Sequence, residues 1–488
     1  MPFLSRCSLT CALTASPPDM RILQATSEFF PYSKTGGLAD MVAGLSGALV
    51  GMGEFITVAT PMYQGIRDNH PEIKPAADAF TVDLGDARAV GRWWRLENAN
   101  GPEVLFLEND YFYNRPGLYM ENGEGYLDNP DRYIFFSRAV ADLAGEFDLL
   151  HLHDWQTALV PMLLKEQGGD GPRTVFTIHN LAYQGACEEE KFRLTGLAPD
   201  LFHQRGPEHF RTFNLLKAGL FYADAITTVS PQYANEIQTA EFGEGLDGEL
   251  KRHNAKLTGI LNGVDYCEWR TRENPHLAAE FDLRDLLGKE LCKSALLTEF
   301  GLPNNGQPLF GVVSRLAEQK GIDHLLEALT EILPAQTIQI VILGDGGAAL
   351  SEQILQLQSA YPEQVSAHIG YDQGISHRIE AGSDFFVMPS RFEPCGLNQL
   401  YSLRYGAIPV VHAVGGLCDT VIDIDEQDGT GITYTGHLPA NLTQAIHRAI
   451  ELFDDSFRMN NVIKAGMEAD FSWAASAQKY QQIYQREG

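Results

Sequence analysis

Short apolar runs alternate with amphipathic stretches along the first half of the chain. The spacer after the first run places Leu38, Met41, Val42, Leu45 and Leu49 at helical intervals. Because strands that alternate with helices usually form a parallel sheet covered on both faces, this half predicts a doubly wound α/β domain. The predicted strands are residues 21–27, 55–60, 104–107, 149–152, 174–178, 225–230 and 257–261.

The second half repeats the same alternation. A helix with Ile322, Leu325, Leu326 and Leu329 on one face follows its first apolar run. The predicted strands here are residues 309–314, 338–343, 365–369, 384–388 and 408–412. A polar and aromatic stretch at residues 266–276 is typical of a linker. The pattern therefore predicts two doubly wound domains, residues 20–264 and 265–470, followed by a terminal helix within residues 471–488.

Composition places the chain among ordinary globular proteins. Its 488 residues are 44% hydrophobic and 20% charged, which suits two domains with real cores. The net charge of −28 disfavours nucleic acid and anionic membranes as partners, so an anionic ligand needs a local basic pocket. Seven unevenly spaced cysteines form no disulfide framework, which favours a cytoplasmic location. No apolar run approaches the roughly 18 residues that span a bilayer.

The first 19 residues need a separate interpretation. Arg6, a weak apolar stretch and Pro17-Pro18 loosely imitate a secretion signal, but polar residues interrupt the apolar part. Because Met20 directly precedes the first predicted strand, we predict that residues 1–19 are a disordered leader or follow a misassigned start. A targeting peptide remains the alternative.

Glycines and basic residues follow several predicted strands. Lys34-Thr35-Gly36-Gly37 joins the first strand to its helix, and paired glycines there let a ligand approach the backbone while Lys34 suits a phosphate. The G-x-G-x-x-G fingerprint is absent from this junction, so a dinucleotide is not indicated. In the second half, Arg315 and Lys320 are expected on a loop before a helix, where both attract an anion. Gly415-Gly416 opens another helix.

The segment Ser390-Arg391-Phe392-Glu393-Pro394-Cys395-Gly396-Leu397 predicts a strand-turn-helix corner. Free amides at such a corner attract a phosphate, and Glu393 could hydrogen-bond sugar hydroxyls beside it. Cys395 as a nucleophile is disfavoured, because its motif holds no base. Taken alone, each of these motifs could also be a plain turn or a solvated charge.

Polar residues are also expected at the carboxyl ends of two central strands, where ligands bind in such sheets. They are His151, His153 and Asp154 after one strand and His179 and Asn180 after the next. A metal could use the histidines, but no further ligands follow at recognisable spacing. We therefore expect hydrogen bonds within a polar crevice, and no metal.

Three motifs together resemble the family of bacterial glycogen synthases and plant starch synthases. They are Lys-Thr-Gly-Gly-Leu-Ala-Asp at residues 34–40, Arg-Leu-x-x-Gln-Lys-Gly at 315–321 and Glu-Pro-Cys-Gly at 393–396. The resemblance runs from Met20 to the end of the chain. Many retaining glycosyltransferases carry Glu-x7-Glu here, and Tyr401 in the second place is similar to the glycogen and starch synthase branch.

The resemblance implies an α/β protein of the GT-B fold: two facing Rossmann-like domains, with the terminal helix crossing back onto the first. It also implies transfer of glucose from ADP-glucose to the non-reducing end of glycogen or another α-1,4-glucan, with retention of configuration and without a metal or other cofactor. The implied catalytic residues are Lys34, His179, Arg315, Lys320 and Glu393. The implied donor and phosphate contacts are Gly36, Gly37, Asn262, Tyr371, Cys395, Gly396, Leu397, Gly415 and Gly416. Asp40, Asp154 and Asn180 are expected to line the cleft on the acceptor side.

In this interpretation, Arg315 and Lys320 stabilise the departing diphosphate in place of an ion. Because Lys34 is far from them in sequence, the domains must face each other for all three to act together. Tyr371 would stack on the nucleobase, or alternatively cap the core. Other functions left open are a related transferase using UDP-glucose or a small acceptor, a glucan-binding protein without catalysis, and a nucleotide-sugar epimerase. Assembly into a homo-oligomer is also left open.

Overall fold

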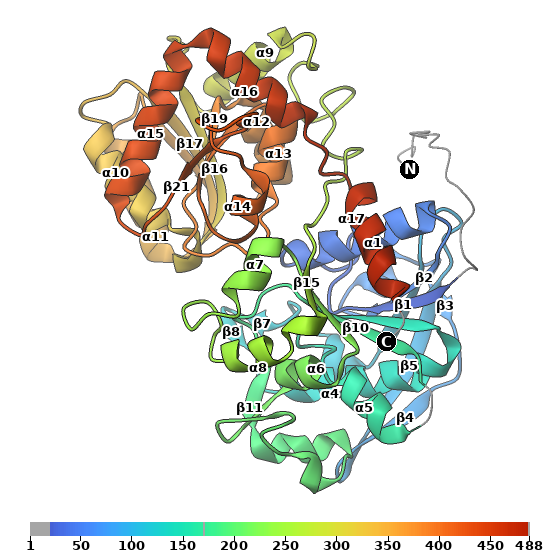
Figure 1. Ribbon diagram of the computed structural model, residues 1–488. Helices are drawn as coiled ribbons and strands as arrows, with labels where there is room; N and C mark the ends of the chain where they lie inside the picture. Colours follow the sequence, from blue (N-terminus) through green and yellow to red (C-terminus); the bar gives the residue numbers. More distant parts are fainter. Residues whose placement is uncertain (1–19, 169–170, 487–488) are drawn as a thin grey trace. The chain divides into compact units, whose positions relative to one another are not determined.

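The computed structural model describes residues 20–168 and 171–486, which form two compact units. Unit 1 contains the described residues up to Val229, residues 234–263 and those from Trp473 onward, and unit 2 contains residues 230–233 and 264–472. Apart from the short excursion at residues 230–233, the chain thus passes between the units at Gly263–Val264 and at Ser472–Trp473 (Figure 1). The predicted leader, residues 1–19, lies outside the described residues.

The sheet of unit 1 is parallel through its centre. Its strand order is β15-β14-β10-β9-β1-β2-β6-β5-β3, and pairing is parallel from β15 to β6. The parallel strands are β1 (Arg21–Ala25), β2 (Phe55–Pro61), β6 (Glu103–Glu108), β9 (Leu149–His153), β10 (Arg173–Ile178), β14 (Ala225–Thr228) and β15 (Leu257–Gly259). Each overlaps a predicted strand, because a strand covered on both faces needs a continuous apolar run.

One edge of this sheet is antiparallel, which adds to the predicted parallel strands. Strand β5 (Ala87–Leu96) pairs antiparallel with β6, and both β3 (Lys74–Pro75) and β4 (Phe80–Leu84) pair antiparallel with β5. Along β5, Trp93 is buried whereas Val90 is 58% exposed. Such one-sided burial is typical of an antiparallel edge and leaves no continuous apolar run for sequence reasoning to find.

Short strands and helices complete unit 1. The short strands are β7 (Met120–Glu121), β8 (Glu124–Gly125), β11 (Ala186–Glu188), β12 (Glu208–His209) and β13 (Thr212–Asn214). The helices are α1 (Gly37–Gly51), α2 (Ile66–Asn69), α3 (Asp110–Tyr113), α4 (Asn129–Leu143), α5 (Val160–Gln167), α6 (Leu215–Tyr222), α8 (Asp247–Arg252) and α17 (Trp473–Tyr484). Helix α7 (Pro231–Glu236) begins in unit 2 and ends in unit 1.

The C-terminal helix α17 packs on α1 within unit 1 (Figure 1). A Cβ atom at Gly44 of α1 would lie 2.0 Å from Nε1 of Trp473, so the indole occupies the space that a larger residue would need. Tyr484 at the other end of α17 places its hydroxyl 2.8 Å from Nδ1 of His151 in β9. The helix therefore reaches the central strands of the unit.

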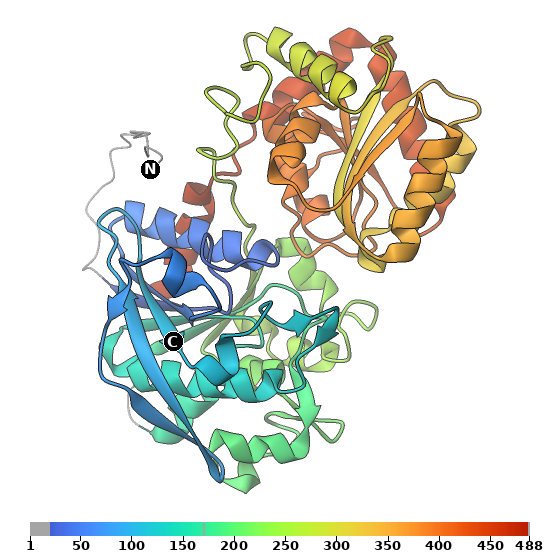
Figure 2. The same cartoon turned by 180° about the vertical axis from the view of Figure 1, so that it is seen from behind.

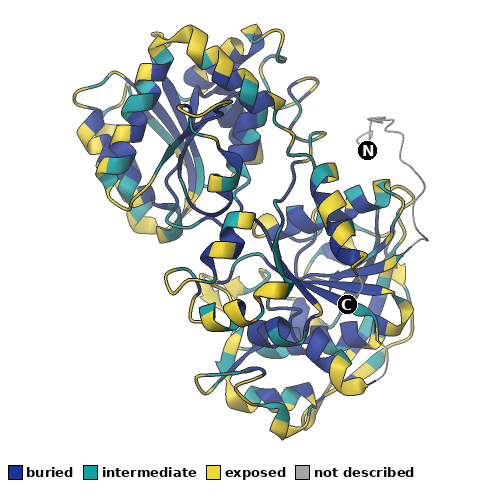
Figure 3. Ribbon diagram, viewed as in Figure 1, coloured by how far each residue is buried: buried dark blue, intermediate teal, exposed yellow. Residues whose placement is uncertain are grey.

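Unit 2 contains a parallel sheet with the order β18-β17-β16-β19-β20-β21. Its strands are β16 (Leu309–Leu316), β17 (Gln339–Gly346), β18 (Val365–Ile369), β19 (Phe385–Met388), β20 (Ile408–His412) and β21 (Ile432–Tyr434). Alternate residues serve two core clusters, with Phe310 and Val312 in one and Leu309 in the other. Both units accordingly have buried strands beneath half-exposed helices (Figure 3). The short edge strand β21 was not predicted.

Helices cover both faces of this sheet (Figures 1 and 2). Helices α10 and α15 contribute to one core cluster, while Leu296 of α9 and Ile379 of α12 contribute to the other. The helices of unit 2 are α9 (Leu287–Glu299), α10 (Ile322–Ile332), α11 (Ala348–Ala360), α12 (Gln373–Gly382), α13 (Asn398–Arg404), α14 (Gly415–Thr420), α15 (Pro439–Asp454) and α16 (Ser456–Glu468). The stretch at residues 266–276, expected as a linker, is instead packed into unit 2.

The contact between α1 and α17 gives a stability prediction with an internal control. We expect Gly44→Ala to destabilise the protein by about 1–3 kcal/mol, because the new methyl group must displace Trp473. Gly47→Ala on the same helix meets no atom within 4 Å and should stabilise by roughly 0.5–1 kcal/mol through helix propensity. Urea unfolding of both variants measures the difference. Equal stability of the two variants would show that α17 is not seated on α1.

Candidate active site

The Lys34–Gly37 loop of unit 1 lies between β1 and α1 and is held by a buried carboxylate. Glu28 accepts hydrogen bonds from Thr35 N at 2.5 Å, Thr35 Oγ1 at 2.6 Å and Gly36 N at 3.2 Å. Lys34 Nζ donates to Asp40 Oδ1 at 2.8 Å, so two predicted site residues contact each other. Sequence reasoning missed Glu28, whose only signal was a carboxylate directly after the first strand.

The paired histidines lie inside β9, which corrects their expected place after the strand. His151 Nε2 lies 2.6 Å from Thr177 Oγ1, and His153 Nε2 lies 3.2 Å from Gln24 Oε1. Burial lowers the pKa of His151 to about 3 and holds the pKa of His153 well below its usual value. Both rings are therefore neutral members of a buried hydrogen-bond network.

Asp154 and His179 are joined at the carboxyl ends of β9 and β10. Asp154 Oδ1 accepts from His179 N at 2.7 Å, and His179 Nε2 lies 3.1 Å from His153 Nδ1. Asp154 has a left-handed backbone, with φ of 57°, and burial raises its pKa to about 7. Such strain and such a shift are common at functional sites. Asn180 follows directly, and its Oδ1 accepts from Ala182 N.

Asn262 lies three residues after β15, on the side of the sheet where the carboxyl ends of the parallel strands meet. Its side chain is almost fully buried, and its Oδ1 has no hydrogen-bond partner among the described residues. A buried amide oxygen without a partner is costly, so this atom is available to a ligand donor. Within residues 20–168 and 171–486, no group of three or more His, Cys, Asp or Glu side chains is arranged to hold a metal ion.

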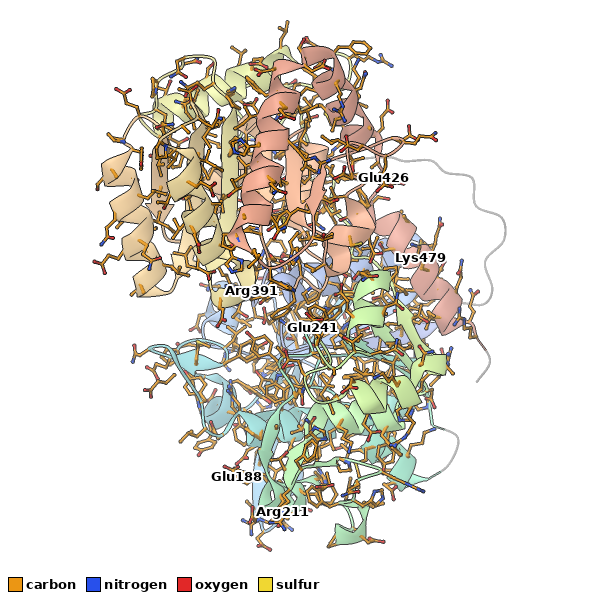
Figure 4. The ribbon with its side chains drawn as sticks, turned by 60° about the vertical axis from the view of Figure 1, so that its left-hand side comes forward. Glu188, Arg211, Glu241, Arg391, Glu426 and Lys479 are labelled. Atoms are coloured by element: carbon orange, nitrogen blue, oxygen red, sulfur yellow. The ribbon has the colours of Figure 1, made fainter. Side chains whose placement is uncertain are left out.

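Unit 1 also contains a cavity of about 580 Å³. Aromatic rings of Tyr126, Trp155 and Tyr183 line it, together with Asn129 and Gln184. Glu188, at the end of β11, lies on its wall, and Figure 4 labels this residue and Arg211 of the β12–β13 turn. Rings mixed with amide and carboxylate groups suit a polar ligand with apolar faces. No pattern in the sequence predicts this cavity.

Unit 2 gathers Arg315, Lys320 and Glu393 at the carboxyl ends of β16 and β19. Lys320 Nζ donates to Glu393 Oε2 at 2.5 Å, and Ser390 Oγ donates to the same oxygen at 3.0 Å. Arg315 lies inside β16, which continues to Leu316, and not on the loop expected after residue 314. Its Nη2 donates to Gln319 Oε1 at 3.2 Å, which holds the guanidinium beside the Lys320 turn.

The segment Ser390–Leu397, here called the donor loop after its predicted role, packs tightly on the glycine pair that opens α14. Gly416 N donates to Glu393 O at 3.0 Å, and a Cβ atom at Gly416 would lie 2.0 Å from Cys395 O. Gly396 and Gly415 both have positive φ, of 72° and 46°, which favours glycine. These glycines therefore permit the close approach of the two turns. Leu397 is the last residue before α13.

The exposed Tyr371 and the half-buried Arg391 flank this arrangement. Tyr371 precedes α12 and is 70% exposed, so the alternative that it caps the core is wrong. Arg391 of the donor loop donates from Nη1 to Asp323 Oδ1 at 2.9 Å and is labelled in Figure 4. That ion pair fixes the donor loop to the first turn of α10.

Comparison with known proteins identifies the family. Residues 21–252 match the family described as "Starch synthase catalytic domain", and residues 297–465 match "Glycosyl transferases group 1". Glycogen synthase from Myxococcus xanthus (strain DK1622) is 45% identical over 475 residues, which cover 95% of this chain and 99% of that protein. This chain belongs to the glycogen and starch synthase family. Glycogen synthase 1 from Geobacter sulfurreducens (strain ATCC 51573 / DSM 12127 / PCA) is 41% identical, covering 96% of each chain.

Comparison with solved structures supports the same family and shows the fold. The catalytic domain of Starch Synthase IV from Arabidopsis thaliana, bound to ADP and acarbose, matches with a TM-score of 0.86 and 31% identity, over 96% of this chain and 99% of that one. The predicted GT-B fold and the identification as a glycosyltransferase are thereby confirmed. Sucrose-phosphate synthase from Thermosynechococcus elongatus (TM-score 0.62, 18% identity, 95% and 98% coverage) shares the fold. No described helix combines the length and apolar character of a membrane span. The roles of individual site residues stay predictions.

The buried histidines predict acid lability. In the folded protein His151 has a pKa of about 3 and is neutral, whereas in the unfolded chain it gains a proton below its ordinary value of 6.5. Its contribution to stability is therefore complete above pH 6.5 and is lost as the pH falls toward 3. We expect the pH slope of the unfolding free energy in this window to be smaller in His151→Gln by up to about 1.4 kcal/mol per pH unit.

Urea titrations between pH 4 and pH 7 measure this slope. Asp154 contributes with the opposite sign, because its raised pKa makes the folded state bind the extra proton, but it does so equally in both proteins. Replacement of the exposed His203 by Gln serves as the control and should leave the slope unchanged. If the His203 and His151 variants behave alike, His151 is not the source of the acid lability.

Proposed function

We propose that this protein transfers glucose from ADP-glucose to the non-reducing end of an α-1,4-glucan such as glycogen, with retention of configuration. The observation that carries the proposal is the set of Arg315, Lys320 and Glu393 at one sheet edge of unit 2. A relative that matches this chain over 96% of its length binds ADP and acarbose, an oligosaccharide-like ligand, which supports both halves of the reaction.

The two cations suit the diphosphate of the donor. Breaking the bond between glucose and phosphate concentrates negative charge on the leaving group, and Arg315 and Lys320 stabilise that charge. Lys34, in unit 1, acts on the same group, so the proposal requires both units to act on one donor molecule. Charge stabilisation by side chains makes a metal unnecessary, and no metal or other cofactor is proposed.

Glu393 holds the glucose and does not attack it. Its Oε2 already accepts hydrogen bonds from Lys320 and Ser390, which fixes the carboxylate and lowers its nucleophilicity. The other oxygen is then available to the hydroxyl groups of the sugar. The acceptor hydroxyl enters on the face that the diphosphate leaves, which retains the configuration at the anomeric carbon.

The acceptor glucan is assigned to the aromatic cavity of unit 1. Trp155 and Tyr183 offer rings on which the apolar faces of glucose units stack, and Asn129 and Gln184 can hydrogen-bond their hydroxyls. Trp155 directly follows Asp154 in the chain, so the cavity adjoins the predicted acceptor-side residues Asp154 and Asn180. No nucleic acid or membrane partner is proposed. A reducing, cytoplasmic location is proposed as well, because the seven cysteines are odd in number and unevenly spaced.

A donor and acceptor assay tests the proposed reaction. Purified protein is incubated with radiolabelled ADP-glucose or UDP-glucose, each with and without glycogen and with and without a chelator. We expect label in the glucan with ADP-glucose, independently of chelation, and little free glucose. Preference for UDP-glucose or transfer to a small acceptor would favour a related transferase. Label released mainly as free glucose would contradict transfer.

Removal of either cation should slow the chemical step. We expect Arg315→Ala and Lys320→Gln each to reduce kcat by about 10²–10³, or roughly 3–4 kcal/mol. Each substitution removes a positive charge that stabilises the negative charge of the leaving group. The Gln side chain in the second variant can still donate to Glu393, so the carboxylate keeps a partner. Arg378→Gln is the matched control, since Arg378 forms its ion pair with Glu299. A drop in kcat of the same size in the control would indicate a general charge effect.

A further inference from the structure

Trp269 is a buried residue of the stretch that the sequence suggests as a linker, and it lies between two helices of unit 2. Its ring stacks on Tyr401 of α13 with centroids 3.7 Å apart and planes 7° apart. On another side it stacks on His377 of α12, at 4.0 Å and 20°. The indole is only 5% exposed. It therefore forms the centre of a stack that joins α12 to α13.

Neighbouring residues of the same stretch strengthen this junction. Asn274 Nδ2 donates to the Tyr405 hydroxyl at 2.9 Å, and that hydroxyl lies 2.9 Å from His377 Nδ1. Because the Tyr405 hydroxyl accepts from the Asn274 amide, its own proton can be donated to His377. Burial lowers the pKa of His377 to about 4, which keeps the ring neutral and able to accept. Ring stacking and hydrogen bonding thus fix the same two helices.

These two helices follow the two ends of the proposed nucleotide site. Helix α12 begins two residues after Tyr371, the residue predicted to stack on the nucleobase, and Asp372 caps it by accepting from Ile375 N at 2.7 Å. Helix α13 begins immediately after the donor loop that carries Glu393. The spacing of the helices therefore sets the distance between the base side and the phosphate side of the site.

We propose that Trp269 is a positioning residue for the donor: by joining α12 to α13 it fixes the spacing of the nucleobase and diphosphate sites. The inference rests on the proposed function, since it presumes a nucleotide in unit 2. A ligand that spans both sites gains from their fixed spacing, because binding at one end presents the other end at a high effective concentration. A ligand that occupies one site gains nothing from that spacing.

This difference provides a test that general destabilisation cannot mimic. Calorimetry on the full chain should give a Kd for ADP about tenfold weaker in Trp269→Ala than in the unaltered protein. Adenosine and inorganic pyrophosphate each occupy one site, and their inhibition constants should change by less than about twofold. Trp269→Phe keeps a flat ring in the stack and should restore most of the ADP affinity. The KM for glycogen should not change.

Trp93→Ala is the control for loss of a buried indole. Trp93 lies in β5 of unit 1, is 5% exposed like Trp269, and stacks on Phe80. This variant should lose stability without any change in ADP affinity. Unaltered ADP binding in Trp269→Ala, or equal weakening of ADP, adenosine and pyrophosphate, would overturn the inference. Failure of the unaltered protein to bind ADP would overturn the proposed function first, and with it the presumption of a nucleotide in unit 2.

Discussion

Parallel pairing of strands is the constraint on which the candidate site depends. When neighbouring strands run in the same direction, their carboxyl ends meet at one edge of the sheet, and the segments that follow them gather there. In unit 2 this brings Arg315 at the end of β16 and Glu393 after β19 to one edge, with Gly416 after β20 close behind Cys395. In unit 1 it brings Asp154 and His179 together from adjacent strands. Predicted site residues that lie far apart in the sequence thus converge where the strands end.

Two lysines of the candidate site, one in each unit, form ion pairs in a chain whose net charge is −28. Lys34 and Lys320 each contact a carboxylate, Asp40 and Glu393, although both are proposed to act on a diphosphate. Glu393 is almost fully buried, so its charge needs a partner, and Lys320 reduces the cost of burying it. The pairing also holds the ammonium group in place. A diphosphate that approaches Lys320 therefore meets a charge whose position is already fixed, which is the condition for strong electrostatic stabilisation.

The sequence predicts what depends on burial on both faces and misses what depends on hydrogen bonding. Continuous apolar runs indicated the central strands of both sheets, whereas the one-sided pattern around Trp93 in β5 did not indicate an edge strand. His153 and Arg315 were expected beyond their strands because polar residues usually end an apolar run. His153 continues β9 because Gln24 and His179 satisfy its ring. Glu28 was missed for the same reason, since nothing local indicates that a carboxylate will hold the Lys34 loop.

Trp269 shows the same limit in a residue outside the sheet. Its polar surroundings in sequence indicated a linker, yet stacking on Tyr401 and His377 makes this stretch part of the core of unit 2. Tyr401 occupies the place where many retaining glycosyltransferases carry a second glutamate. A glutamate there could not stack on an indole, so the substitution exchanges a polar side chain for a rigid junction between α12 and α13. Packing on Trp269 therefore accounts for an aromatic residue at position 401, and this junction is the basis of the positioning role proposed for Trp269.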